Sequence, residues 1–213
     1  MRRYDLHLHS KYSYDSVSEP KSIVSIAKSL GLDGIAVTDH NTIKGGLATK
    51  EFETLDFEVI VGTEIHTDEG DVIGLYLSEE IIARNLIEVI DEMRAQGATI
   101  IIPHPFDENR DSALHPKDDV ARLVDGVEGY NSRCRNQLYN ELAVTYANTH
   151  NLAVVAGNDA HCTREIGNAW TIFDSDLREA IVQRKTQIYG VPSHLVNRWL
   201  SKSIKKLKLI GNK

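Results

Sequence analysis

Short runs of apolar, mostly β-branched residues recur along the chain, and they predict seven strands. Each run is four to six residues long and is bounded by polar residues, glycine or proline. The predicted strands are Tyr4–His7, Gly34–Thr38, Val59–Gly62, Val72–Leu77, Thr99–Ile102, Val127–Tyr130 and Ala153–Ala156.

Four stretches between or after these runs carry apolar residues at the spacing of an amphipathic helix. The predicted helices are residues 19–30 behind a capping Ser18, Arg84–Gln96, Asn136–His150, and Asp176–Lys185 behind a capping Ser175. Gly31 and Gly97 end the first two of them. Strands that alternate with helices predict parallel βα units and therefore an α/β layer fold or barrel.

The composition is that of a globular protein, with 41% apolar and 26% charged residues among 213. This length fits one large domain, over residues 1–190, followed by a short basic extension over residues 191–213. No apolar run reaches membrane-spanning length, and the start of the chain is too polar for a signal peptide. Two cysteines cannot build a disulfide framework, so we expect a reducing, cytoplasmic setting. We also expect no membrane partner.

Charge is unevenly distributed along the chain. The net charge is −7, yet residues 196–213 hold six basic residues and no acidic one. The rest of the chain therefore carries a more negative net charge than the whole chain. This charge disfavours a general nucleic-acid surface and suits binding of divalent cations. The basic end, "RWLSKSIKKLKLIGNK", predicts a solvated amphipathic helix; contact with phosphates, RNA or another subunit is the alternative.

Residues that can bind metals follow one predicted strand after another. They are His7 and His9, Asp39 and His40, Glu64, His104, and Asp159 with His161. Parallel α/β barrels assemble their sites from the carboxyl ends of several strands, so these side chains should converge. Without a cation, the buried carboxylates would repel one another and the imidazoles would lack partners.

Histidines and carboxylates without cysteine favour zinc, manganese or iron at an open, hydrolytic site. The ligands are too many for one ion, so two or three divalent metal ions are expected. A multinuclear cluster with a shared hydroxide suits phosphoester hydrolysis, because it activates water and neutralises phosphoryl charge. Amide hydrolysis remains an alternative at this point.

Five stretches, "DLHLHS", "AVTDH", "GTEI", "IPHP" and "GNDAH", occur in the order found in the polymerase-and-histidinol-phosphatase (PHP) family, which the chain resembles. The resemblance implies a distorted seven-stranded (β/α) barrel of the TIM type with a trinuclear metal site. It implies three ligand sets: His7, His9, Glu64 and Asp159 for one metal, Glu64 and His104 for a second, and Asp15, His40 and His161 for the third.

The chain departs from the family pattern at Asp71 in "DVIGLYL", where many members have a histidine. Asp71 is therefore predicted to bind the second metal weakly, through water, or not at all. Arg133 and Arg164 follow site residues closely and are expected to bind phosphate, with Arg110 as a weaker candidate.

The sequence thus predicts a hydrolase that cleaves small phosphomonoesters or nucleotides through a metal-bridging hydroxide. The predicted catalytic residues are Glu64, Asp159, His161, Arg164 and Arg133. One alternative is an exonuclease or nucleotide phosphodiesterase whose basic tail guides the strand. Amidohydrolases also open with an H-x-H strand, but here no lysine ends a middle strand as a bridging ligand. A non-catalytic metal-binding module is the third alternative.

Overall fold

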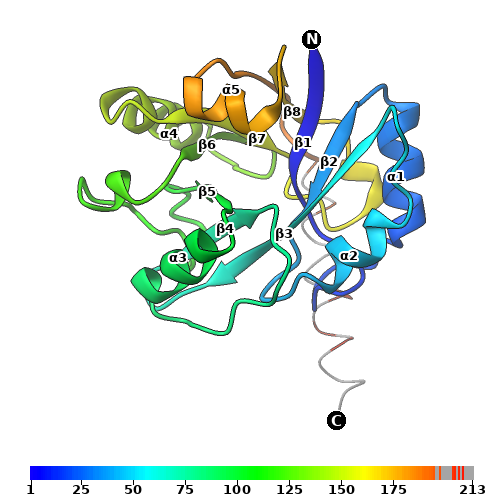
Figure 1. The fold of residues 1–213 in the computed structure, drawn as a ribbon, viewed down its shortest axis with the longest axis horizontal. Helices are drawn as coiled ribbons and strands as arrows, with labels where there is room; N and C mark the ends of the chain where they lie inside the picture. Colours follow the sequence, from blue (N-terminus) through cyan, green and yellow to red (C-terminus); the bar gives the residue numbers. More distant parts are fainter. Residues whose placement is uncertain (195–196, 198–202, 205, 207, 209–213) are drawn as a thin grey trace.

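One mixed sheet forms the centre of the protein (Figure 1). The structure, a computed structural model, describes residues 1–194, 197, 203, 204, 206 and 208. Within this part of the chain the sheet has nine strands: β1 (Arg2–Leu8), β2 (Gly34–Val37), β3 (Glu58–His66), β4 (Asp71–Leu75), β5 (Thr99–Ile102), β6 (Gly126–Asn131), β7 (Ala153–Gly157), β8 (Ala169–Phe173) and β9 (Gln187–Gly190). Their spatial order is β7-β6-β5-β4-β3-β2-β1-β8-β9.

The sheet curls until its two halves nearly close into a barrel. Strands β1, β2 and β3 pair in parallel, as do β5, β6 and β7, whereas β4, β8 and β9 pair antiparallel with their neighbours. Just past the end of β7, the amide of Asp159 donates to the carbonyl of His7 at 2.7 Å, and the amide of His9 donates to the carbonyl of Ala160 at 2.9 Å. The carboxyl ends of β1 and β7 are thereby held side by side.

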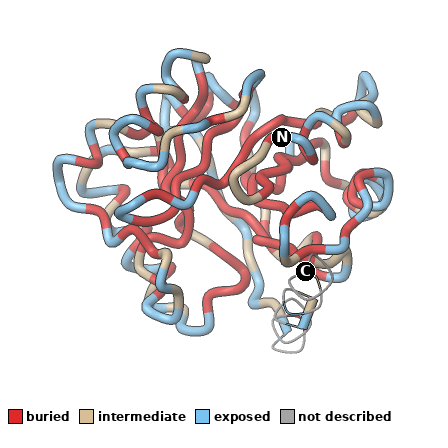
Figure 2. The backbone as a smooth tube through the Cα atoms, turned by 90° about the horizontal axis from the view of Figure 1, so that it is seen from below, coloured by how far each residue is buried: buried red, intermediate tan, exposed pale blue. Residues whose placement is uncertain are grey.

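Helices cover the outside of this barrel-like sheet, and Figure 2 shows the buried backbone concentrated between them. They are α1 (Pro20–Ser29), α2 (Lys44–Lys50), α3 (Leu86–Ala95), α4 (Gln137–Thr149) and α5 (Leu177–Gln183), with two 3-10 turns at Val120–Arg122 and Thr163–Glu165. Helix α1 packs Ile23, Val24 and Ala27 onto β2 residues, and α3 packs Val89, Ile90 and Met93 into a second apolar cluster. No helix of the described residues is long and apolar enough to cross a membrane.

The α/β class is as the sequence predicts, but the expectation of seven parallel strands is wrong. Strands β8 and β9 are additional, and four of the eight strand pairs are antiparallel. Strand β9 has exposed and half-buried residues in alternation, so it lacks the apolar run that marks the other strands. Strand β8 follows the loop after β7 without a helix long enough to indicate a further βα unit.

Helix α2 is absent from the prediction because two glycines, Gly45 and Gly46, make its sequence a poor helix former. The structure explains why a glycine stands at the first of these positions. A Cβ atom on Gly45 would lie 1.7 Å from the Oδ2 atom of Asp39 and 2.2 Å from the Oγ atom of Ser10. The helix can therefore begin directly against the Asp39 carboxylate only when this residue has no side chain.

The helix caps also differ from the prediction at two places. The residue before α1 is Glu19 rather than Ser18, and its side chain makes no capping hydrogen bond. Helix α5 is capped by Asp176 rather than Ser175, and the Asp176 carboxylate accepts from two backbone amides of the first turn. The predicted basic extension, residues 191–213, lies largely outside the described residues; residues 197, 203, 204, 206 and 208 have helical backbone.

Candidate metal centre

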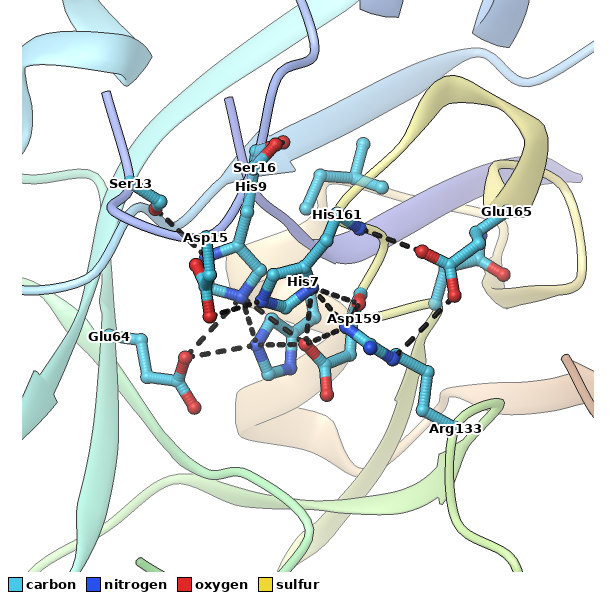
Figure 3. Close-up of polar contacts among 12 residues, drawn as sticks. His7, His9, Ser13, Asp15, Ser16, Glu64, Arg133, Asp159, His161 and Glu165 are labelled. Atoms are coloured by element: carbon cyan, nitrogen blue, oxygen red, sulfur yellow. Dashed lines mark hydrogen bonds and ion pairs between the residues drawn. The ribbon is translucent and has the colours of Figure 1, made fainter. Parts of the chain in front are cut away.

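The predicted ligands meet at the carboxyl ends of the strands around β1 (Figure 3). His7 lies in β1 and His9 directly after it, and their Nε2 atoms are 3.1 Å apart. Glu64 comes from β3, and Asp159 and His161 come from the loop after β7. All five side chains are at least 94% buried. Segments distant in the sequence therefore converge on one buried, polar cluster.

His7, His9 and Asp159 form a first group of three ligating atoms. The Nε2 atom of His9 lies 3.3 Å from the Asp159 Oδ1 atom, and that of His7 lies 3.8 Å from it. Ligands about 2.1 Å from a tetrahedrally coordinated ion stand roughly 3.4 Å apart, so these separations fit a shared cation.

Glu64 lies at the junction of the cluster. Its Oε2 atom is 3.4 Å from the Nε2 atoms of both His7 and His9 and 3.1 Å from the Nδ1 atom of His40. Its Oε1 atom is 2.9 Å from the Nε2 atom of His104. The Oε2 atom is buried and has no hydrogen-bond partner among the described residues. An unpartnered buried carboxylate oxygen among imidazoles fits a metal ligand, and Glu64 can face more than one ion.

A second and a third group complete the cluster. His7, Glu64 and His104 bring three ligating atoms together, and so do His9, His40 and His161. The carboxylate of Asp15 joins the latter group, because its Oδ2 atom lies 3.1 Å from the Nε2 atom of His161 and 3.5 Å from that of His40. The groups overlap the three predicted ligand sets but are not identical to them, because His9 lies with His40 and His161, and His7 lies with Glu64 and His104.

Asp71 lies at the edge of the cluster, outside the three groups of ligating atoms. Its Oδ1 atom accepts a hydrogen bond from Nδ1 of the exposed His66 at 2.9 Å, and its Oδ2 atom is 4.0 Å from the Nε2 atom of His104. Burial raises the pKa of Asp71, and the nearby Glu64 raises it further. This position leaves a weak or water-mediated role for Asp71.

Glu128, in the middle of β6, supports the cluster, although the sequence does not single it out. Its Oε1 atom lies 3.0 Å from the Nδ1 atom of His7. Its Oε2 atom accepts from the amide of His104 at 2.8 Å and from the side chain of Asn131 at 2.9 Å. A carboxylate that orients a ligating imidazole raises its basicity and fixes its tautomer. A lone glutamate in an apolar strand is the signal that could have indicated it.

Asp39, which the sequence places among the possible metal ligands, instead orients the loop after β1. Its carboxylate accepts from the amide of Ser10 at 2.7 Å and from the hydroxyls of Ser10 and Ser13, each at 2.6 Å. Ser13 in turn lies 3.2 Å from the Nδ1 atom of His9, and its hydroxyl accepts from the amide of His40 at 3.1 Å. These contacts link His9 and His40, two predicted ligands, to the buried carboxylate of Asp39.

The three candidate arginines lie in different surroundings. The guanidinium of Arg110 donates to the Asp159 Oδ2 atom at 2.5 Å and to the Asp107 carboxylate at 3.1 Å. Arg133 is buried, donates to the carbonyl of Asp159 at 3.2 Å and contacts the Nδ1 atom of His161. Arg164 is exposed, and no contact between it and the cluster is found within the described part of the chain. The site therefore favours Arg110 and Arg133 over Arg164.

The carboxylates and imidazoles of the metal-free cluster shift each other's pKa values. Burial lowers the pKa of His7, but the carboxylates of Glu128, Glu64 and Asp159 outweigh it and raise that pKa well above its usual value. For His40, Glu64 and Asp15 outweigh burial in the same way. Burial and the neighbouring His161 and His40 instead lower the pKa of His9 to about 3.

These shifts predict that metal binding releases protons. The raised pKa values of His7 and His40 favour their protonated forms without metal, and each must lose its proton to become a ligand. Metal affinity should therefore increase with pH through neutrality, by up to about tenfold per unit for each proton released. Calorimetric titration of Mn²⁺ in two buffers of different ionisation enthalpy measures the release. Equal heats in both buffers would contradict the prediction.

Comparison with known proteins places the chain among related sequences and folds. The sequence model described as "PHP domain" matches residues 5–158, and the one described as "PHP-associated" matches residues 137–186. Two uncharacterized proteins of Methanocaldococcus jannaschii are each 39% identical, one over 66% of this chain and 88% of its own length, the other over 80% and 70%.

A solved structure shows the same fold at lower sequence identity. It is a two-domain protein of Bacteroides vulgatus that contains a predicted PHP-like metal-dependent phosphoesterase. The TM-score is 0.75 at 23% identity, and the match covers 89% of this chain but 65% of the Bacteroides chain. At this identity the likeness concerns the fold alone.

Proposed function

Because the chain belongs to the PHP domain family, we propose that it is a metal-dependent phosphoesterase that hydrolyses small phosphomonoesters or nucleotides. The observation that carries the proposal is the buried Oε2 atom of Glu64, which lies among three imidazoles without a hydrogen-bond partner within the described residues. The proposed ligands are His7, His9, Asp15, His40, Glu64, His104, Asp159 and His161, with Asp71 as a weaker one.

Bound divalent cations would supply an activated water at neutral pH and would neutralise charge on the phosphoryl oxygens. The protein's own residues hold the geometry of this site. Glu128 keeps the imidazole of His7 oriented toward Glu64, and Asp39 fixes the loop that carries Asp15 through Ser10 and Ser13.

Arg110 and Arg133 supply the positive side chains that a phosphate ester requires. Both lie against Asp159, and Arg110 remains 19% exposed, so its guanidinium borders both the buried cluster and solvent. A guanidinium in this position orients the ligating carboxylate and can donate its remaining N–H groups to a phosphoryl oxygen. A net charge of −7 disfavours long nucleic-acid substrates more than small phosphorylated ones, because a long strand brings many more negative charges to the protein.

The test is phosphate release from a panel of monophosphates, nucleotides and nucleoside bisphosphates by protein reconstituted with Mn²⁺, Zn²⁺ or Fe²⁺. We expect release that requires metal, with His161→Ala as the inactive blank. Cleavage of diesters or oligonucleotides in place of monoesters would favour the phosphodiesterase alternative. Metal binding without turnover of any ester would favour the non-catalytic module.

A further inference from the structure

The basic end of the chain contacts the loop that carries Asp15. The ammonium group of Lys208 donates to three backbone carbonyls, those of Lys11 at 2.9 Å, Ser13 at 2.8 Å and Ser16 at 2.7 Å. These residues are separated from Lys208 by more than 190 positions. All three carbonyls accept from this one ammonium group, and without it each would need another donor. The contact therefore fixes the course of the loop.

This loop positions one of the proposed ligands. Asp15 lies between the Ser13 and Ser16 anchor points, with its carboxylate directed toward His161 (Figure 3). The hydroxyl of Ser16 donates to the carbonyl of His9 at 2.8 Å, which ties the same loop to the end of β1. A change in the course of the loop would therefore move Asp15 relative to His161.

A second contact links the segment after β9 to the loop that carries His161, the histidine that faces Asp15. The amide of Ser193 donates to the carbonyl of Ser132 at 2.7 Å, and its hydroxyl donates to the Glu165 carboxylate at 3.0 Å. The other oxygen of Glu165 accepts from the amide of His161 at 2.9 Å. The segment that begins at residue 191 thus touches the loops of both Asp15 and His161.

We propose that Lys208 is a positioning residue for the third metal site, where it holds Asp15 in place to bind the cation with His40 and His161. The inference rests on the proposed function, because it takes the ligand sets from it. It also gives Lys208 of the basic extension a role that does not involve nucleic acid, because its ammonium group binds the chain's own carbonyls.

Metal binding by Lys208→Met tests the proposal without relying on activity. Calorimetry and elemental analysis with Mn²⁺ should show one of three binding steps, that of the third site, reduced by at least about tenfold, the usual loss when a group that orients a ligand is removed. The other two steps should stay unchanged. Lys206→Met is the matched control, because Lys206 is exposed and its replacement removes the same charge from the same segment. Lys208→Arg should recover part of the affinity.

The outcomes separate this proposal from the function on which it rests. Unchanged binding of all three metals in Lys208→Met would overturn the positioning role while leaving the phosphoesterase proposal standing. Equal weakening of all three steps would overturn it as well, because that pattern indicates general destabilisation. Wild-type protein that binds no metal would overturn both proposals together.

Discussion

Replacing Asp159 by Asn should lower phosphate release about a thousandfold, equivalent to about 4 kcal/mol of transition-state stabilisation. Asp159 is buried and lies against His7 and His9 on one side and Arg110 on the other. Burial alone would raise its pKa, but Arg110 and His7 hold that pKa well below the usual range, so the group is an anion available to a cation. Asn keeps the shape of the side chain but removes the charge.

Asparagine also suits the backbone at this position. Asp159 has a φ of 54°, in the left-handed region, and Asn is among the few residues that adopt this conformation readily. Steady-state phosphate release and metal content, both measured on the folded variant, check the prediction. Asp174→Asn is the control, because the Asp174 side chain is 75% exposed and faces the N-terminal ammonium group, away from the cluster. A rate near that of the wild type in Asp159→Asn would show that this carboxylate is not part of the catalytic site.

Arg110→Met should lower kcat/KM about a hundredfold, the usual cost of removing one charge-stabilising donor from a site. The change removes both the donor to Asp159 and the cation that faces the phosphate. Methionine keeps much of the length and apolar stem of arginine, so the loop that holds Arg110 retains its packing. Steady-state kinetics with the best substrate of the panel measures the effect.

Variants of two other arginines serve as comparisons for this prediction. Arg135 is exposed on the loop after β6 and Arg135→Met should keep the wild-type rate. Arg164→Met compares the sequence-based candidate with the one that the structure favours. A larger loss in Arg164→Met than in Arg110→Met would reverse the assignment of the phosphate-binding arginine.

The convergence of the proposed ligands could be predicted from sequence because it follows from local rules. Alternation along a strand places His7 and His9 on one face, and the carboxyl ends of neighbouring parallel strands place Glu64 and Asp159 beside them. The ordered motifs also predict membership of the PHP family, which the sequence comparison confirms. These features depend on spacing along the chain and not on the exact course of any loop.

Other parts of the site depend on tertiary contacts that spacing does not encode. Glu128 resembles any other strand residue until the fold brings its carboxylate against His7 of β1 and the amide of His104 after β5. Arg110 reaches Asp159 across 49 positions from a loop whose conformation the sequence does not specify. Helix α2 forms despite Gly45 and Gly46, because its packing against Asp39 and Val61 outweighs its poor propensity.

The most direct test of the account is phosphate release by metal-free protein to which Mn²⁺ is returned in steps. Metal content and rate are measured on the same samples. We predict no release from the metal-free protein and a rate that rises as the buried sites fill. Release at full rate by protein shown to contain no metal would contradict it.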